Sequence, residues 1–307
     1  MPSPAPVGGA NGKGMIYELT PNADGSWTET VLYSFSDSFE PYPSVAILDA
    51  SGNLYGTTEF GGTKGFGTVF ELTPSAGGGW TETVLHTFTG QDGGFPGSLI
   101  FDAAGNLYGT SQSGANGHGG IFELKPAAGG AWVEKMIYGF PILGRYGIAP
   151  AGLTIDKAGK LYGTTFAGGS SHCNNEGTLG CGTVFELTRN ASGKWTETLL
   201  YSFSNTGGDG NNPTSAPVFD AAGNLYGITS GGGANSLGAV FELTPAADGS
   251  WTETVLHSFS RSGGDGYVPV GGAVLDSAGR VYGATGSGGN GMCKASDGCG
   301  TIFEITP

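Results

Sequence analysis

Short stretches in which polar and apolar residues alternate recur along the whole chain. The clearest predicts that Trp27, Glu29, Val31, Tyr33 and Phe35 share one side of a strand, with the residues between them on the other. A period of two with aromatic and β-branched residues is typical of a β-strand. No helical period persists for ten residues, so we predict an all-β fold.

These strand patterns fall into a unit of four that repeats along the chain. Strand A ends in Asp, as in 98–102, and strand B reads Asn-Leu-Tyr-Gly-Thr, as in 106–110. Strand C reads Gly-Thr-Val-Phe-Glu-Leu-Thr, as in 67–73, and strand D is the alternating type of 27–35. The Glu of strand C marks the period, recurring as Glu18, Glu71, Glu123, Glu186, Glu242 and Glu304. Spacings of about 50 to 60 residues suit propeller blades.

The connection between strands A and B carries a turn signal in every repeat. The sequence Asp-x-(Ala/Ser)-Gly occurs as Asp49/Gly52, Asp102/Gly105, Asp156/Gly159, Asp220/Gly223 and Asp276/Gly279. Asp accepts backbone hydrogen bonds within such a turn, and Gly adopts the left-handed conformation. Four antiparallel strands per repeat predict a five-bladed β-propeller over residues 14–307, with 1–13 as a flexible arm. Six blades, or a fragment of a longer array, are the alternatives.

The repeated motifs also resemble a known family. Gly-Asn-Leu-Tyr-Gly-Thr-Thr, Gly-Thr-Val-Phe-Glu-Leu-Thr-Pro and Val-Leu-Tyr-Ser-Phe, within residues 14–307, resemble the Gloeobacter/Verrucomicrobia (GloVer) tandem-repeat family. The resemblance implies an exported, propeller-like protein, often tied to cell-surface anchoring signals, with no firm biochemical activity. The Asp-x-x-Gly-Asn-Leu-Tyr hairpin also resembles the NHL type of blade, which supports the topology only.

The number of strands does not divide evenly into blades. Strand C occurs six times, whereas strands A, B and D occur five times. We predict that the hairpin of residues 14–35, a C–D pair, closes the ring with the last blade, 268–307, and that one C strand is surplus. In the alternative, this surplus strand docks on a neighbouring molecule, and head-to-tail docking makes a filament. The residues predicted for closure or assembly are Met15, Tyr17, Leu19, Trp27, Val31, Ile302, Phe303 and Ile305.

The four cysteines form two local pairs, Cys173/Cys181 and Cys293/Cys299, and each second Cys directly precedes a C strand. Matched local pairs predict disulfides and an oxidising compartment, because these spacings are not those of zinc sites. We therefore expect a secreted or cell-surface protein. The N-terminus lacks the basic start and apolar core of a signal peptide, so a signal would have been removed or left out.

Composition and net charge argue against several classes of binding partner. The 61 Gly residues among 307 supply the turns, while 11% aromatic residues indicate a packed protein rather than a disordered one. The net charge of −14 argues against nucleic acid and against anionic membrane surfaces. No run of about 18 apolar residues occurs, so we expect no membrane insertion.

The loops between strands D and A contain the candidate ligand residues Asp92, Asp209 and Asp265, each beside Gly. Carboxylates here would suit Ca²⁺ or sugar hydroxyls, although an Asp in a loop more often serves the turn itself. The Asp-x-Asp-x-Asp-Gly pattern of calcium loops is absent. We therefore expect no cofactor, with Ca²⁺ as the alternative.

Catalytic signals are weak. His86 and His257 replace the Tyr of strand D and are expected to pack. The carboxylates that we interpret as breaking the repeat are Asp37, Glu40, Glu59, Glu134, Glu176 and Asp297. They form no clear pair for glycoside cleavage, and no Gly-x-Ser-x-Gly elbow occurs.

We therefore predict a non-catalytic extracellular propeller with a structural or adhesive role. Self-assembly into filaments is the version of that role that follows if the surplus strand docks on a neighbour. Its expected partners are itself or surface glycans. A lectin-like module that uses one loop face and a glycoside-active enzyme are the alternatives.

Overall fold

The computed structural model describes residues 8–36, 42–44, 46–114, 117–141, 147–171, 173, 180–289 and 298–307. It confirms the all-β prediction: the chain is a five-bladed β-propeller of antiparallel blades. The described residues contain one 3₁₀ turn, Ala128–Gly130, and no α-helix. The chain divides into two compact units, Met1–Gly139 and Phe140–Pro307, which are described separately.

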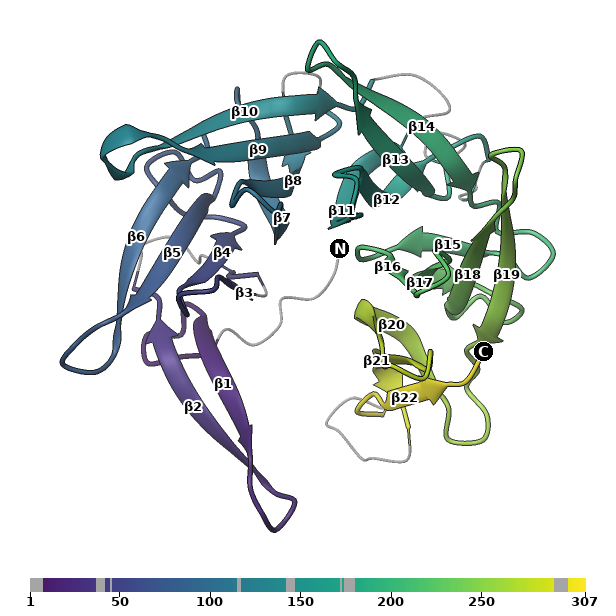
Figure 1. Ribbon diagram of the computed structural model, residues 1–307. Coiled ribbons are helices and arrows are strands. Elements are labelled where there is room, and N and C mark those ends of the chain that lie inside the picture. The colour runs from purple at the N-terminus through teal and green to yellow at the C-terminus, as the bar shows by residue number, and fades with distance from the viewer. Residues whose placement is uncertain are drawn as a thin grey trace. The chain divides into compact units, whose positions relative to one another are not determined.

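The first unit contains three sheets (Figure 1). The N-terminal hairpin pairs β1 (Met15–Pro21) with β2 (Trp27–Ser34). The next blade contains β3 (Ile47–Leu48), β4 (Leu54–Thr58), β5 (Thr68–Pro74) and β6 (Trp80–Thr87). The last blade of this unit contains β7 (Gly94–Phe101), β8 (Leu107–Ser113), β9 (Gly120–Pro126) and β10 (Trp132–Gly139).

The second unit also contains three sheets. The first comprises β11 (Gly147–Ile155), β12 (Leu161–Gly168), β13 (Thr183–Arg189) and β14 (Trp195–Ser202). In the next, strand A is split into β15 (Gly210–Pro213) and β16 (Val218–Phe219), followed by β17 (Leu225–Gly232), β18 (Ala239–Pro245) and β19 (Trp251–Ser258). The last has β20 (Gly266–Leu275), β21 (Val281–Gly288) and β22 (Ile302–Ile305).

The predicted excess of C strands is present. The C strands are β1, β5, β9, β13, β18 and β22, and the D strands are β2, β6, β10, β14 and β19. Within the described ranges, β1 pairs with β2 alone and β22 with β21 alone. Closure of the ring by the hairpin therefore stays a prediction.

The prediction that residues alternate strictly between the two faces of strand D was wrong. In every D strand the pairing with strand C skips one residue, so that β6 passes from Val84 to His86 in register with Phe70 and Val69. The skipped residue is Leu32, Leu85, Ile137, Leu200 or Leu256. Such a β-bulge opposes two residues to one and re-aims the side chains that follow. Leu85 consequently packs against the core, whereas the neighbouring Val84 is exposed.

A glycine of strand B and a phenylalanine of strand C fit together in every blade. Gly56 lies opposite Phe70 in register, and a Cβ added to Gly56 would come within 2.5 Å of the ring's Cζ. The same fit recurs in Gly109/Phe122, Gly163/Phe185, Gly227/Phe241 and Gly283/Phe303. The glycine is needed because the ring of the neighbouring strand fills the space of its side chain.

Each of these rings also contacts the phenylalanine that follows the preceding D strand. Phe35 meets Phe70 edge-on with ring centroids 5.2 Å apart. Equivalent pairs at 5.0–5.3 Å are Phe88–Phe122, Phe140–Phe185, Phe203–Phe241 and Phe259–Phe303. Edge-to-face packing is the favoured geometry of aromatic pairs. Successive repeats are therefore joined through one buried aromatic contact.

The predicted turn chemistry is also confirmed. Asp49 Oδ1 accepts hydrogen bonds from the amides of Ser51 and Asn53, and Gly52 has φ 85°. The Glu of strand C is structural: the hydroxyl of Tyr55 donates to Glu71 at 2.7 Å. Strands A, B and C of a blade thus share one polar contact at this end.

A disulfide joins Cys173 to Cys181, as predicted. Cys299 is also disulfide-bonded, while its predicted partner, Cys293, lies outside the described residues. No helix among the described residues is long and apolar enough to cross a membrane.

We expect Gly56→Ala to destabilise the first unit by about 1–3 kcal/mol, because the new methyl group would overlap the buried Phe70 ring. Urea unfolding followed by tryptophan fluorescence measures the loss. Gly77→Ala is the matched control, since a Cβ at Gly77 meets nothing within 4 Å. Equal midpoints for the two variants would contradict the role assigned to the glycine.

Candidate functional site

One cluster in the first unit brings together three side chains capable of binding a metal. His86 comes from β6, Asp92 from the loop before β7, and Glu134 from β10. Their nitrogen and carboxylate oxygen atoms all lie within 4.8 Å of one another. His86 Nε2 is 3.2 Å from Asp92 Oδ2, and all three side chains are half-buried.

Local structure holds each member of the cluster in place. Asp92 Oδ1 accepts hydrogen bonds of 2.8 Å from both the amide and the hydroxyl of Thr89, which closes the loop. The His86 ring packs edge-on against Phe88, with centroids 4.7 Å apart. Packing of His86 was predicted, but its contact with the loop carboxylate was missed.

The electrostatics of the cluster are unusual for carboxylates. Burial raises the pKa of Glu134 to about 7, and the nearby Asp92 adds to the effect. The Oε1 atom of Glu134 is buried and has no hydrogen-bond partner among the described residues. Burial opposes ionisation of Asp92, but the Thr89 hydrogen bonds outweigh it and lower the pKa of that carboxyl. Burial lowers the pKa of His86, although Asp92 acts in the opposite direction.

The cluster belongs to a set of contacts that recurs between successive D strands. We call this set the seam: a Tyr or His of one D strand, an Asp of the loop that follows it, and a Glu of the next D strand. The Tyr33 hydroxyl donates to Glu82 at 2.8 Å, and burial together with Asp209 and Glu253 raises the pKa of Tyr201. Glu134 occupies the same D-strand position as Glu82, so its interpretation as a residue that breaks the repeat was wrong.

The three Asp residues predicted as ligands lie at this seam. Asp209 Oδ2 accepts from the amide and hydroxyl of Ser204, as Asp92 does from Thr89. Asp265 accepts from the Ser260 amide and lies 3.1 Å from Nε2 of His257. Each therefore serves its own loop, which was the preferred interpretation, and Asp92 and Asp265 also each contact a D-strand histidine. The structure leaves ligand binding by these residues untested.

The other candidate carboxylates form no site in the described parts of the chain. Asp37, Glu40, Glu176 and Asp297 lie outside those parts. Glu59 is half-buried, and burial raises the pKa of its carboxyl.

The sequence analysis also missed a strained residue at the start of every A strand. Tyr42, Phe95, Ala149, Asn212 and Val268 each precede Pro, and each has φ between 42° and 55°. This conformation is rare outside Gly and is a clear outlier for a β-branched residue. The amide of Val268 donates to the carbonyl of Leu237, in the loop before β18, which holds the strained residue in place. The Pro found at this point in all five repeats was the available signal.

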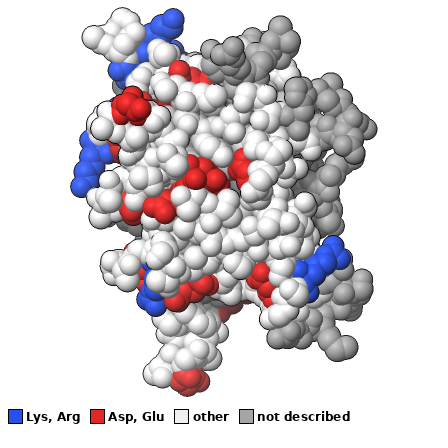
Figure 2. Space-filling view, turned by 90° about the vertical axis from the view of Figure 1, so that its right-hand side faces the viewer, with Lys and Arg blue, Asp and Glu red and all other residues white. Residues whose placement is uncertain are grey.

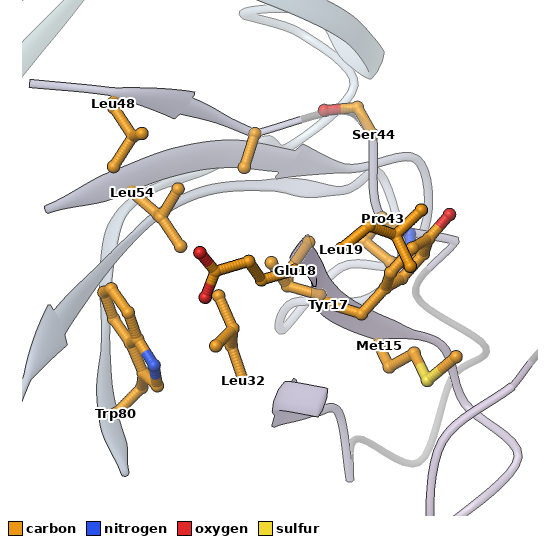
Figure 3. Close-up of a pocket in the computed structure, with 12 residues that line it drawn as sticks. Met15, Tyr17, Glu18, Leu19, Leu32, Pro43, Ser44, Leu48, Leu54 and Trp80 are labelled. Carbon is orange, nitrogen blue, oxygen red and sulfur yellow. The ribbon is translucent and has the colours of Figure 1, made fainter. Parts of the chain in front are cut away.

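An apolar groove of about 670 Å³ lies between the N-terminal hairpin and the following blade (Figure 3). Leu32, Leu54 and Trp80 line it together with Glu18 of β1. The remaining lining residues are Met15, Ile16, Tyr17, Leu19, Pro43, Ser44, Ala46 and Leu48. The groove occurs where β1, unlike the C strands β5 and β9, has no B strand beside it.

Two residues of β1 are uncovered as a result. Tyr17 and Leu19 are 50% and 49% exposed. At the equivalent positions the side chains are at most 1% exposed: Phe70, Phe122, Phe185 and Phe241 for Tyr17, and Leu72, Leu124, Leu187 and Leu243 for Leu19. The predicted assembly residues Trp27 and Val31 are exposed as well.

The last C strand, β22, is uncovered on its opposite face. Phe303 and Ile305 pack in the core formed with Phe259 and Val281. Ile302, in contrast, is 80% exposed, whereas its equivalents Val69, Ile121, Val184 and Val240 are fully buried. The two outermost C strands thus each expose apolar side chains that are buried in the internal blades: Tyr17 and Leu19 in β1, and Ile302 in β22.

Figure 2 shows acidic side chains across the middle of the viewed face and basic ones nearer its edges. This distribution agrees with the net charge of −14.

Comparison with known proteins identifies a family and a fold. A family model described as Gloeobacter/Verrucomicrobia repeat matches residues 5–180 and 171–307. No curated protein matches the chain.

Several solved structures are similar. A glucose dehydrogenase has a TM-score of 0.52 and 15% identity, over 94% of this chain and 90% of its own. An ulvan lyase, which is a polysaccharide lyase, has a TM-score of 0.52 and 11% identity, over 95% and 87%. A protein of unknown function from Dyadobacter fermentans has a TM-score of 0.47 and 12% identity, over 80% and 74%. At these identities the likeness concerns the fold alone.

The raised pKa of one carboxyl group in the seam predicts that the stability of the fold depends on pH. Burial, with Asp209 nearby, raises the pKa of Glu253 to about 7, above its usual value of 4.5. The folded state therefore holds more protons than the unfolded state between these two pH values, and stability falls as pH rises through them. We expect Glu253→Gln to lose less stability than the wild type between pH 4.5 and pH 8 in urea unfolding. A constant difference between the two proteins across this range would contradict the assignment.

Proposed function

The chain belongs to the Gloeobacter/Verrucomicrobia repeat family, and from this premise we propose that it is a non-catalytic, secreted propeller protein. Its role is structural or adhesive, and its copies join head to tail through the β1–β2 hairpin. The observation that carries this proposal is the half exposure of Tyr17 and Leu19, at positions that are buried in every internal blade.

The proposed contact places β1 of one copy beside β21 of the next, where it displaces β22 of that copy. In the register of β22, Tyr17 would lie opposite Gly283, and Leu19 opposite Val281. Tyr17 would then take the place of Phe303 against Phe259, so both exposed side chains of β1 would become covered. An edge strand with exposed apolar residues favours such strand addition.

The polar seam supports the same occupant. His257 and Asp265 form a contact like that of His86 and Asp92, but β20–β22 includes no D strand to supply the third residue, a Glu. In the hairpin, Glu29 of β2 is at the D-strand position of Glu134 and is exposed. A docked hairpin would thus supply both the missing strand and its Glu.

A non-catalytic role is supported by where the carboxylates are used. The Glu residues of strand C and the Asp residues of the turns and loops accept hydrogen bonds within their own blades. The disulfide between Cys173 and Cys181 supports an oxidising compartment, and therefore secretion.

A glycan-binding role is the second candidate, favoured by an aromatic cluster in the first unit. Tyr42, Phe60, Phe95 and Phe66 form a chain of ring contacts with centroids 5.4–5.7 Å apart. Tyr42 precedes β3, Phe60 and Phe66 lie between β4 and β5, and Phe95 lies near the start of β7. Aromatic side chains are typical of ligand-binding surfaces. Binding to a glycan array that Phe60→Ala abolishes would favour this role over assembly.

We expect the variant Tyr17→Asp/Leu19→Asp to be monomeric at concentrations at which the wild type forms assemblies, because charge would be buried at the contact. Sedimentation velocity and electron microscopy measure the assemblies. Val84→Asp/Val133→Asp is the control, since these residues are equally exposed but lie on D strands of internal blades. A strictly monomeric wild type at high concentration would overturn the proposal.

A cysteine pair tests the register directly. Glu18→Cys and Tyr282→Cys in one chain would face each other across the proposed β1–β21 pair, because Glu304 faces Tyr282 in β22. On a non-reducing denaturing gel, the proposal requires a ladder of linked chains. A cross-link confined to single chains would indicate ring closure instead, and no cross-link would exclude the pairing; either result overturns the proposal.

A further inference from the structure

We propose that His86, Asp92 and Glu134 form a binding site for a divalent transition-metal ion, of which Zn²⁺ is the best fit. This site is independent of the proposed assembly, because its residues lie on β6, the following loop and β10, whereas the proposed contact uses β1–β2 and β20–β22. The ion would join β6, the following loop and β10.

The atoms are already close enough for one ion. One nitrogen and two carboxylate oxygens lie within 4.8 Å of one another, so small side-chain shifts bring them to zinc distances of about 2.0–2.2 Å. His86 and Asp92 retain 19% and 28% of their side-chain exposure, so the cluster lies close to the protein surface. Three protein ligands leave a fourth position for water.

One carboxylate oxygen of the cluster lacks a partner, and a bound ion would supply one. The Oε1 atom of Glu134 is buried without a hydrogen-bond partner among the described residues. At the equivalent place in the preceding seam, the hydroxyl of Tyr33 reaches Glu82 and satisfies it. In the cluster, the imidazole contacts Asp92 and leaves Glu134 unsatisfied. Glu253 Oε1, beside Tyr201, is likewise buried without a partner among the described residues, so it is the imidazole that sets this cluster apart. A cation between the three groups would satisfy both carboxylates and His86 Nε2 together.

The other versions of the seam show why this one is selected. Where Tyr occupies the His86 position, as Tyr201 does, the imidazole ligand is missing. Where His recurs, as His257 beside Asp265, no Glu from a following D strand is present in β20–β22. His, Asp and Glu therefore meet at one seam among the described residues.

The donor set points to zinc rather than calcium. Ca²⁺ prefers six to eight oxygen ligands, whereas an imidazole nitrogen and carboxylate oxygens are both ligands that zinc accepts. Cys173 and Cys181 are joined in a disulfide and do not compete as thiolates.

Zinc titration of the full-length, untagged protein by calorimetry tests the site. We expect wild type and His257→Tyr to bind Zn²⁺, and His86→Tyr to bind about 100-fold more weakly or not at all. His86→Tyr introduces the residue that three other D strands carry, so the fold should be retained, which circular dichroism checks. X-ray absorption of the zinc-loaded protein should show nitrogen and oxygen ligands without sulfur.

Two results would overturn the proposal. One is a wild type that binds no zinc, in which case Glu134 is satisfied by a proton instead. The other is a His86→Tyr variant that binds as tightly as wild type, which would place the ion elsewhere. Glu134→Gln, which keeps the shape of the side chain, should weaken binding without loss of thermal stability in the absence of metal.

Discussion

The fit of a strand C phenylalanine over a strand B glycine is the contact on which the rest of the structure depends. Phe70 fills the side-chain space of Gly56, and its edge meets Phe35 of the preceding repeat. One ring therefore fixes the B–C pairing within a blade and the packing between repeats. Because each repeat completes the core of its neighbour, a series of such repeats has two ends at which the contact is unfinished. Tyr17 is the member of the C-strand set that has no glycine strand beside it, and it is half exposed.

The strands, the turns and the sixth C strand could be predicted because their signals are local. An alternation with period two identifies a strand, and an Asp–Gly pair identifies a turn, within ten residues of sequence. The bulge was missed because one skipped residue, such as Leu85, changes the pairing without changing the composition of the strand. The left-handed Val268 was missed because local preference opposes it: a residue before Pro favours extended backbone. In the structure, a hydrogen bond to Leu237 in the preceding repeat helps to hold it.

The candidate site was harder to predict, because its members are far apart in sequence. Asp92 was identified as a loop ligand, His86 as a packing residue and Glu134 as an irregularity. Only the stacking of β6 against β10 shows that the three meet. The strand register shows that Glu134 is equivalent to Glu82, since Glu134 pairs opposite Leu124 as Glu82 pairs opposite Leu72. The sequence carried the same signal, because Glu134 follows Trp132 by two residues as Glu82 follows Trp80.

At one position of the seam, the packing and the chemistry of a side chain depend on different parts of its ring. At the variable position, Tyr33 and His86 both pack edge-on against the phenylalanine two residues later, with centroids 5.1 and 4.7 Å apart. The ring therefore contributes the same packing whichever residue carries it, while its polar end changes from a phenol to an imidazole. A phenol donates one proton to a carboxylate, whereas an imidazole can coordinate a cation. Because the aromatic contact is kept, the repeat can exchange one chemistry for the other without disturbing the interlock that holds the blades together.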